Sequence, residues 1–283
     1  MRLKQPYFTS ALLISLTVSL CYAEPISEAD LHSAVPIDTQ IEFIADGDNP
    51  FPILIQEAVR ADALGSLVIL TDTQSQQRWL EQSNPLRLYL AQHGWQTLSL
   101  PLPDKPIKTD RVSEEDFTEQ LTDYENQVMV RIESGLDLVS EERIVLLAMG
   151  RSAEWAIRVI QNQPDMHLFM LNPRPIDDNE PRALLEGMTA VESRIIDLFQ
   201  EPYPSDQKAI PDALTRKNAM IRSNHPHYHQ QAIKEALWSS QPDWLNRQIR
   251  GLLNTYIVKA EEHNQAPGQD ALAVDELPPG VRQ

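Results

Sequence analysis

Short apolar runs alternate with stretches of helical period along most of the chain. The runs are continuous instead of alternating with polar residues, which is typical of strands buried on both faces of a parallel sheet. We therefore expect strands at residues 67–70, 97–100, 144–149, 168–171 and 195–199, and a last strand at about 229–236.

Between the runs, apolar residues recur with the spacing of helices. We expect helices over residues 84–92, 114–138, 152–162, 209–222 and 243–260. Two further apolar segments, 41–44 and 51–56, flank the turn sequence Asp-Gly-Asp-Asn and predict a hairpin. An antiparallel hairpin followed by repeated strand and helix units indicates an α/β three-layer sandwich with a mostly parallel sheet.

Composition excludes several classes of function. The 283 residues include only nine glycines, and none of them lies in a glycine-rich phosphate-binding loop. The chain has 24 Lys and Arg residues and 41 Asp and Glu residues, for a net charge of −17. Binding to nucleic acid or to anionic lipid begins with basic side chains that neutralise phosphate. We therefore expect no nucleic-acid partner and no membrane-surface partner.

The first 23 residues have the pattern of a secretory signal peptide. Arg2 and Lys4 are followed by an apolar stretch over 11–20 and by small residues up to Ala23. A lipoprotein signal at Cys21 is the alternative, but Leu20 stands where such a signal needs a small residue. Cleavage after Ala23 removes the only cysteine, which excludes disulfides and thiolate chemistry. We expect an exported, periplasmic protein without a membrane span in its mature chain.

The pattern then divides the mature chain into three parts. Residues 24–37 are expected to be flexible, residues 38–260 to form one α/β domain, and residues 261–283 to form a disordered acidic tail with several Pro and Gly residues.

Two segments carry a resemblance to a known family. They are Gly-Trp-Gln-Thr-Leu-Ser-Leu-Pro-Leu-Pro at 94–103 and Arg-Ile-Val-Leu-Leu-Ala-Met-Gly-Arg-Ser-Ala at 143–153. With Arg-Gln-Ile-Arg-Gly-Leu-Leu at 247–253, they resemble an uncharacterised family of secreted bacterial proteins related to the α/β-hydrolase superfamily. The resemblance implies an α/β-hydrolase-like fold over most of residues 40–258 and no established activity.

A hydrolase of this fold has a nucleophile on a sharp turn between a strand and a helix, with small residues two before and two after it. With Gly150 at this turn, Ala148 and Ser152 are the flanking residues. With Ser152 at the turn, the bulky Glu154 would stand where a small residue is required. We therefore place Gly150 at the elbow, where glycine relieves backbone strain and removes the nucleophile.

The remaining catalytic groups of a serine hydrolase are also in doubt. The base should be a His after the last strand, but the loop at 237–242 reads Leu-Trp-Ser-Ser-Gln-Pro. A displaced His229 would be needed instead. Glu201 or Asp206 could be the acid. The loop after residue 70, which should help to stabilise an oxyanion, lacks the His-Gly-Gly pattern of esterases.

Other groups of residues allow a binding function. His225, His227 and His229 fall at alternate positions and are a weak candidate for zinc or copper, against the simpler reading of an exposed strand. Arg174 and Arg182 could hold an anionic ligand at the mouth of the sheet, or be ordinary surface charge. The acidic series over 114–125 is expected to be a solvated helix face, with a cap over the carboxyl edge of the sheet as the alternative.

From the sequence we interpret the chain as an exported α/β-hydrolase-like protein that lacks the usual triad. It would act by binding an envelope protein or a small ligand, without a cofactor. One alternative is a serine ester hydrolase using Ser152, with Asp206 or Glu201 and His229. Another is a structural envelope protein with no ligand pocket.

Overall fold

The computed structural model of the chain describes residues 28–45, 50–72, 78–203, 210–234 and 242–265. By its internal contacts the chain divides into two units, residues 1–34 and residues 35–283. In the first unit, helix α1 (Glu28–Ala34) lies within the stretch that the pattern left as flexible. Acidic residues in its first turn and His32 in its last turn match the helix dipole, which favours helix here. The predicted signal at 1–23 lies outside the described residues.

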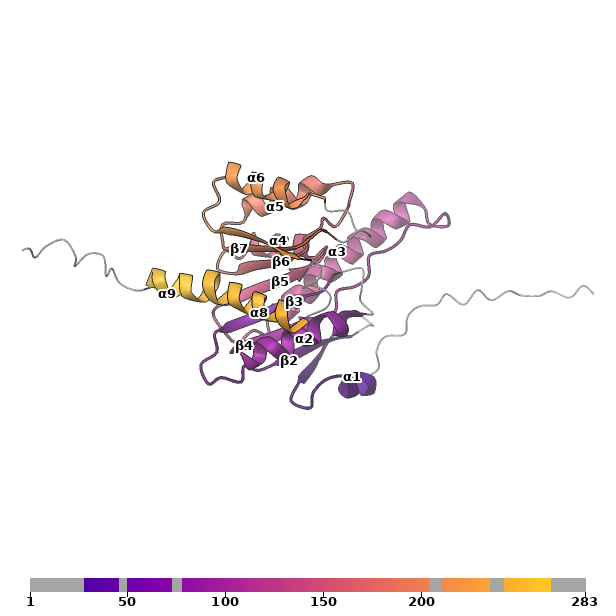
Figure 1. Ribbon diagram of the computed structural model, residues 1–283. Coiled ribbons are helices and arrows are strands. Elements are labelled where there is room, and N and C mark those ends of the chain that lie inside the picture. The colour runs from indigo at the N-terminus through magenta and orange to yellow at the C-terminus, as the bar shows by residue number, and fades with distance from the viewer. Residues whose placement is uncertain (1–27, 46–49, 73–77, 204–209, 235–241, 266–283) are drawn as a thin grey trace, which may run out of the picture. The chain divides into compact units, whose positions relative to one another are not determined.

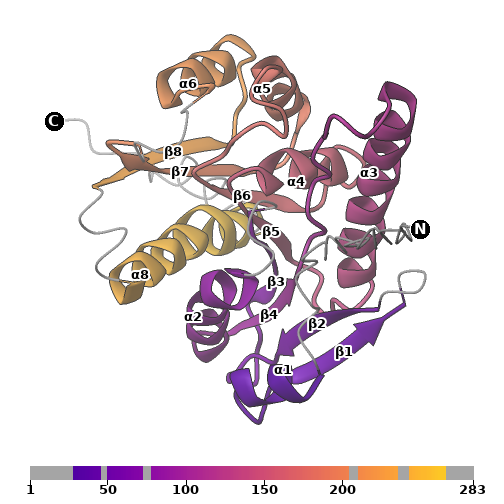
Figure 2. The same cartoon turned by 90° about the vertical axis from the view of Figure 1, so that its right-hand side faces the viewer.

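The second unit is built on one eight-stranded sheet in its described part, with the order β1-β2-β4-β3-β5-β6-β7-β8 (Figure 1 and Figure 2). The strands are β1 (Gln40–Ile44), β2 (Phe51–Gln56), β3 (Gly65–Leu70), β4 (Trp95–Leu100), β5 (Ile144–Met149), β6 (His167–Leu171), β7 (Ile195–Glu201) and β8 (Tyr228–Lys234). The pairs β1–β2 and β2–β4 are antiparallel. All other neighbours are parallel.

Helices cover both faces of this sheet (Figure 2). The first core contains side chains of α3 (Glu114–Leu136), α4 (Ser152–Ile160), α5 (Pro181–Ala190) and α6 (Ala213–Arg222). The second core contains side chains of α2 (Trp79–Gln92), α8 (Pro242–Leu253) and the π-helical turn η2 (Asn254–Val258), which continues into α9 (Lys259–Gln265). The predicted three-layer sandwich, with its antiparallel start and mostly parallel sheet, is therefore confirmed.

The central strands explain why the apolar runs are continuous. Every residue of β3, β4 and β6 is buried, because helices pack on both faces of these strands. No helix in the described part of the chain is long and apolar enough to cross a membrane.

Some elements differ from the expected boundaries. Helix α2 begins at Trp79, five residues before the expected start at residue 84, and Pro85 lies inside it. Trp79 Nε1 donates a hydrogen bond to Ser99 Oγ at 2.7 Å, which attaches the first turn of the helix to β4. Helix α5 was not predicted, since only Leu184 and Met188 of its side chains are buried.

The last helical stretch passes the expected boundary at residue 260. It continues through α9, and Glu261, which the pattern assigned to the disordered tail, forms hydrogen bonds with Arg143 and His167. These partners are distant in sequence, so local composition did not reveal them. Residues 266–283 lie outside the described residues.

A buried ion pair fixes the β7–β8 side of the sheet. Arg216 of α6 donates from Nε and Nη2 to the carboxylate of Asp197 in β7, at 2.8 and 2.9 Å, and both side chains are almost fully buried. Tyr228 and Gln230 of β8 donate to the same carboxylate. Burial alone would lower the pKa of Arg216, but Asp197 raises it above its ordinary value. The network therefore ties α6 to both strands.

Candidate functional site

The turn between β5 and α4 has the backbone geometry of a strand-to-helix elbow. Gly150 occupies this turn with φ +58°, a left-handed conformation that glycine adopts without steric cost. Its N–H donates to the carbonyl of Leu171 at 2.9 Å, and its carbonyl accepts from the N–H of Arg174 at 3.0 Å. The elbow is thus held by the segment that follows β6.

The space above Gly150 is filled by the carboxylate of Asp72. A Cβ atom added to Gly150 would lie 2.2 Å from Oδ2 and 2.7 Å from Cγ of Asp72. Asp72 follows β3 and belongs to the loop where a hydrolase would have part of its oxyanion site. A side chain at residue 150 therefore meets both backbone strain and a steric conflict. Sequence reasoning missed this role of Asp72, because no local pattern places one loop above another.

Ser152 lies in the first turn of α4 and is fully buried. Its hydroxyl accepts from the N–H of Met149 at 2.9 Å and lies 2.9 Å from the carbonyl of Leu70, to which it donates. In this arrangement the hydroxyl links the ends of β3 and β5 and faces protein on all sides. A nucleophilic role for Ser152 stays a prediction that would require this hydroxyl to be released.

The other triad candidates do not gather at the elbow in the described residues. Glu201 is exposed at the end of β7, and Asp206 lies outside the described residues. His229 lies in β8, where its ring stacks on Tyr256 with centroids 3.8 Å apart, and burial lowers its pKa. The loop after β8, residues 235–241, is not described, and its sequence contains no His.

The three histidines do not converge on a common point. His225 Nε2 lies 2.8 Å from the carbonyl of Val191, and its Nδ1 accepts from the N–H of His227 at 3.2 Å. Nδ1 is thus the acceptor and Nε2 the donor, so neither nitrogen of His225 has a lone pair left for a metal. Within the described ranges, no group of three or more His, Cys, Asp or Glu residues could hold a metal ion.

Two arginines lie buried next to the elbow. Arg151 Nη1 donates to the carbonyls of Pro175 and Ile176 at 2.9 and 2.8 Å. Arg151 and Arg174 both reach Asp178, with N–O distances of 2.8 and 3.4 Å. Burial alone would raise the pKa of Asp178, but hydrogen bonds and charge from the two arginines hold it below the ordinary value.

Of the two arginines proposed from the sequence as anion-binding groups, only Arg174 lies at this site. Arg174 is 6% exposed, and its backbone bonds directly to Gly150. Arg182 is largely exposed in α5, beside Glu186 at 3.6 Å. The acidic residues of the 114–125 series are likewise exposed, in agreement with a solvated helix face; they are Glu114, Glu115, Asp116, Glu119, Asp123 and Glu125.

Two residues that the sequence did not single out complete the carboxyl edge of the sheet. Asn172 follows β6 with φ +47°, an unusual conformation for a residue with a side chain. Tyr203 follows β7 and donates its hydroxyl to the carbonyl of Asn172 at 3.2 Å. Burial raises the pKa of Tyr203 to about 12, with the charge of Arg174 lowering it and that of Asp72 raising it.

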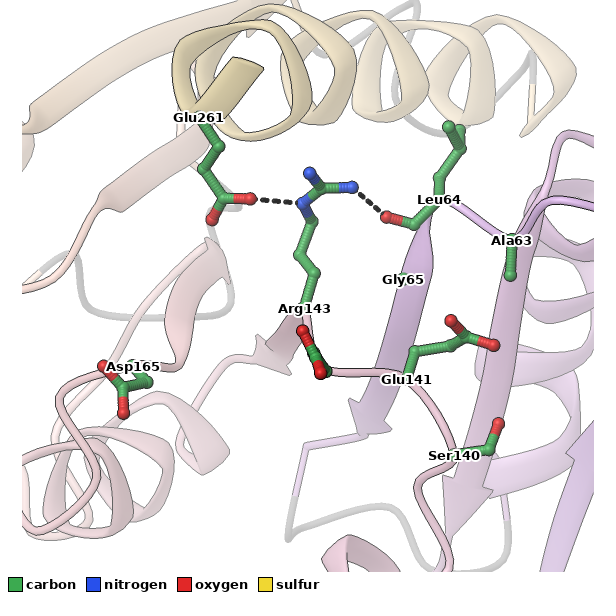
Figure 3. Close-up of a pocket in the computed structure, with 9 residues that line it drawn as sticks. Ala63, Leu64, Gly65, Ser140, Glu141, Arg143, Asp165 and Glu261 are labelled. Carbon is green, nitrogen blue, oxygen red and sulfur yellow. Dashed lines mark hydrogen bonds and ion pairs between the residues drawn. The ribbon is translucent and has the colours of Figure 1, made fainter. Parts of the chain in front are cut away.

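A separate cavity of about 750 Å³ opens at the opposite, amino edge of the strands (Figure 3). Carboxylates of Glu141, Glu142, Asp165 and Glu261 line it, and among the described residues that line it Arg143 is the only basic one. Arg143 donates to Glu261 Oε2 at 2.5 Å and to the carbonyl of Leu64. The cavity is thus acidic, and it lies away from the elbow.

His167, the first residue of β6, contacts the same carboxylate. His167 Nε2 lies 2.5 Å from Glu261 Oε1. Burial lowers the pKa of His167, although its bond to Glu261 acts in the opposite direction. Burial alone would raise the pKa of Glu261, but its bonds to His167 and Arg143 hold it below the ordinary value. Glu261 therefore connects α9 to the amino ends of β5 and β6.

Solved structures similar to this one share its fold. A serine hydrolase homologue from Coxiella burnetii matches with TM-score 0.52 and 12% identity, over 75% of this chain and 97% of that one. A putative dienelactone hydrolase from Klebsiella pneumoniae matches with TM-score 0.51 and 10% identity, over 76% and 96%. An acylaminoacyl peptidase from Pyrococcus horikoshii matches with TM-score 0.52 and 9% identity, over 78% and 42%. At these identities the likeness concerns the fold alone.

Sequence comparison assigns the family. No curated protein matches the chain by sequence. The model of a family described as protein of unknown function (DUF3530) matches residues 23–120 and 107–255, which together span most of the chain. The chain therefore belongs to this family of unknown function, and its fold is that of the α/β hydrolases.

Proposed function

We propose that this protein is exported to the periplasm and uses its α/β-hydrolase fold for binding instead of Ser-His-Asp catalysis. One observation carries the proposal: the elbow residue is Gly150, and the carboxylate of Asp72 fills the space that a nucleophilic side chain at this residue would need. The same place in a serine hydrolase holds the attacking hydroxyl.

The surroundings of Ser152 support the same proposal. A nucleophilic serine needs an exposed hydroxyl within hydrogen-bond distance of a general base. Ser152 is instead fully buried, and the atoms near its hydroxyl belong to the backbone at Leu70 and Met149. A binding role needs no free nucleophile, and the elbow lies at the carboxyl edge of the sheet, where open α/β sheets commonly bind ligands.

A fluorophosphonate probe tests this proposal directly. We expect the purified, folded protein to show no labelling and no turnover of short-chain nitrophenyl esters above the buffer rate. The matched control is Ser152→Ala, which should behave as the wild type does, and an active serine esterase of the same fold should label under the same conditions.

The alternative of a serine hydrolase predicts the opposite result. Labelling of the wild type that is abolished in Ser152→Ala would overturn the proposal and identify Ser152 as the nucleophile. In that case His229→Ala should also abolish labelling, because it is the displaced base that the sequence offers. A circular-dichroism melt of each variant excludes simple unfolding as the cause.

Export has its own test. We propose cleavage after Ala23, and intact-mass analysis of protein isolated from the periplasm should give a chain that begins at Glu24. A lipid-modified chain beginning at Cys21 would instead support the lipoprotein alternative.

A further inference from the structure

Helix α4 begins at the elbow. The side chains at its start do not accept hydrogen bonds from the N–H groups of its first turn. Arg151, at the N-cap, makes no side-chain capping bond. The hydroxyl of Ser152 points back to Met149 and Leu70. The carboxylate of Glu154 accepts from the N–H of Ile176 and from Arg158. Helix N-termini carry unsatisfied N–H donors and the positive end of the helix dipole, so an anion is favoured there.

The anion found at this helix start comes from another part of the chain. Asp72, after β3, places Oδ2 only 2.2 Å from where a Cβ of Gly150 would stand, directly before the first residues of α4. The absence of a side chain at Gly150 leaves this space, which lies at the carboxyl edge of the parallel sheet. A carboxylate therefore stands where a hydrolase would stabilise a negatively charged oxygen.

The buried side chains around the elbow add further positive charge. Arg151 and Arg174 are 7% and 6% exposed, and the two guanidinium groups share a single carboxylate, that of Asp178. The Nε atom of each has no hydrogen-bond partner among the described residues. The backbone N–H of Arg174 donates to the carbonyl of Gly150 at 3.0 Å, and Oδ2 of Asp72 lies next to the same glycine, so both residues border the elbow.

We propose that the elbow is an anion-binding site that Asp72 occupies as an internal ligand. We define the elbow site as Gly150, the first peptide groups of α4, Asp72 and Arg174. A ligand that carries a carboxylate or phosphate group binds there when it displaces the carboxylate of Asp72. This inference names the ligand class for the binding role proposed above and rests on that role.

Removing the internal ligand should expose the site. We expect Asp72→Ala to bind inorganic phosphate and acetate at least about tenfold more tightly than the wild type, measured by isothermal titration calorimetry at constant ionic strength. The reason is that apparent affinity falls with the fraction of molecules whose site is open, and a site occupied by Asp72 is mostly closed. In NMR spectra of this variant, the backbone amide signals of Arg151 and Ser152 should shift when phosphate is added.

A matched control separates the site from overall charge. The net charge of −17 repels anions at long range, so removal of any carboxylate could raise phosphate affinity slightly. Asp110 is an exposed aspartate in the segment before α3, and Asp110→Ala removes the same charge without opening the elbow. We expect its phosphate affinity to stay at the wild-type value.

Arg174 gives a second test of the same site. In the Asp72→Ala background, Arg174→Gln should reduce phosphate binding at least about fivefold, because hydrogen bonds to charged groups are the stronger ones. The comparison uses only variants with cooperative melts. If Arg174→Gln does not fold, the amide shifts of Arg151 and Ser152 in the single variant decide the question.

Three results would overturn the inference. They are no gain in phosphate or acetate affinity in folded Asp72→Ala, an equal gain in Asp110→Ala, or amide shifts confined to residues away from the elbow. Fluorophosphonate labelling through Ser152 would refute the proposed binding role by a different measurement, so the two failures are distinguishable.

Discussion

Two glycines with positive φ stand at opposite edges of the sheet, and their surroundings differ. Gly65, with φ +148°, begins β3 at the amino edge, and a Cβ there would lie 2.6 Å from the backbone carbonyl oxygen of Arg143. Gly150, with φ +58°, lies at the carboxyl edge, and a Cβ there would meet the side chain of Asp72. The space beside Gly65 is therefore occupied by backbone, which cannot rotate away, and the space beside Gly150 by a side chain, which can.

This difference separates a structural glycine from a glycine at a candidate site. At Gly65 no single second substitution removes the obstacle, because every residue has a carbonyl oxygen. At Gly150 the obstacle is one carboxylate, and the space beneath it belongs to the elbow site. The amino edge also carries the acidic cavity and the Arg143–Glu261 pair, so its charge is opposite in sign to that of the buried arginines at the elbow.

The largest expected effect is that of Gly65→Ala. A backbone conflict combined with a strained φ should lower the free energy of unfolding by about 4 kcal/mol. Urea denaturation followed by circular dichroism measures this change. The matched control is Gly251→Ala in α8, where a Cβ meets nothing within 4 Å. That variant should gain roughly 0.5–1 kcal/mol, since alanine favours helix.

Gly150→Ala should lower the free energy of unfolding by about 2–3 kcal/mol, and part of this loss should be recoverable. In the double variant Gly150→Ala/Asp72→Ala the steric conflict is gone and only the backbone strain remains. We expect a coupling energy of about 1–2 kcal/mol in the double-mutant cycle. Strict additivity of the two substitutions would show that Asp72 does not restrict residue 150.

Glu261→Gln tests the amino edge. It weakens the pairs with Arg143 and His167 and should cost about 1 kcal/mol, since these groups are partly exposed. Hydrogen exchange should increase in α9 and remain unchanged at the elbow. The control Glu262→Gln, at an exposed neighbouring residue of α9, should leave both unchanged.

The smallest effect is the pH dependence of stability. Burial lowers the pKa of His167 below 6.5, so the unfolded chain takes up a proton first. The stability from neutral His167 is thus present above about pH 6.5 and is lost as the pH falls toward the folded-state pKa. Glu261, whose pKa is also lowered, contributes above about pH 4.5 and loses this contribution below it.

His167→Gln should therefore weaken the decline in the free energy of unfolding between pH 7 and 5, by less than about 1 kcal/mol, as measured by urea denaturation at each pH. His225 and His229 also have lowered pKa values, so part of the decline should remain. A decline identical to that of the wild type would show that His167 does not contribute to it.

The pattern of the sequence was a good guide to the layers of this fold. Parallel strands that are buried on both faces are mostly apolar, so β5 and β6 are readable as nearly continuous apolar runs. The position of Gly150 between β5 and α4 follows from the same local reading. Helix α5 was missed, because only Leu184 and Met188 face the core and its other residues carry no periodic signal.

The candidate site was predictable only in part. The sequence offered Gly150 and Arg174, and both lie at the elbow, whereas Arg182 does not. Asp72 lies 78 positions before Gly150, and Arg143 lies 118 positions before Glu261. Such pairs depend on which loops meet at an edge of the sheet, and no local pattern encodes this.

The sequence by itself determined the strands, most helices and the position of the glycine at the elbow. Burial patterns and backbone strain depend on a few neighbouring residues, so they can be read from the order of residues. The three-dimensional packing alone decided that Asp72 lies over Gly150, that Ser152 is fully buried, and that Arg151 and Arg174 share Asp178. Those outcomes come from contacts between segments far apart in the chain, since side-chain charges and volumes act on whatever the fold brings within a few ångströms.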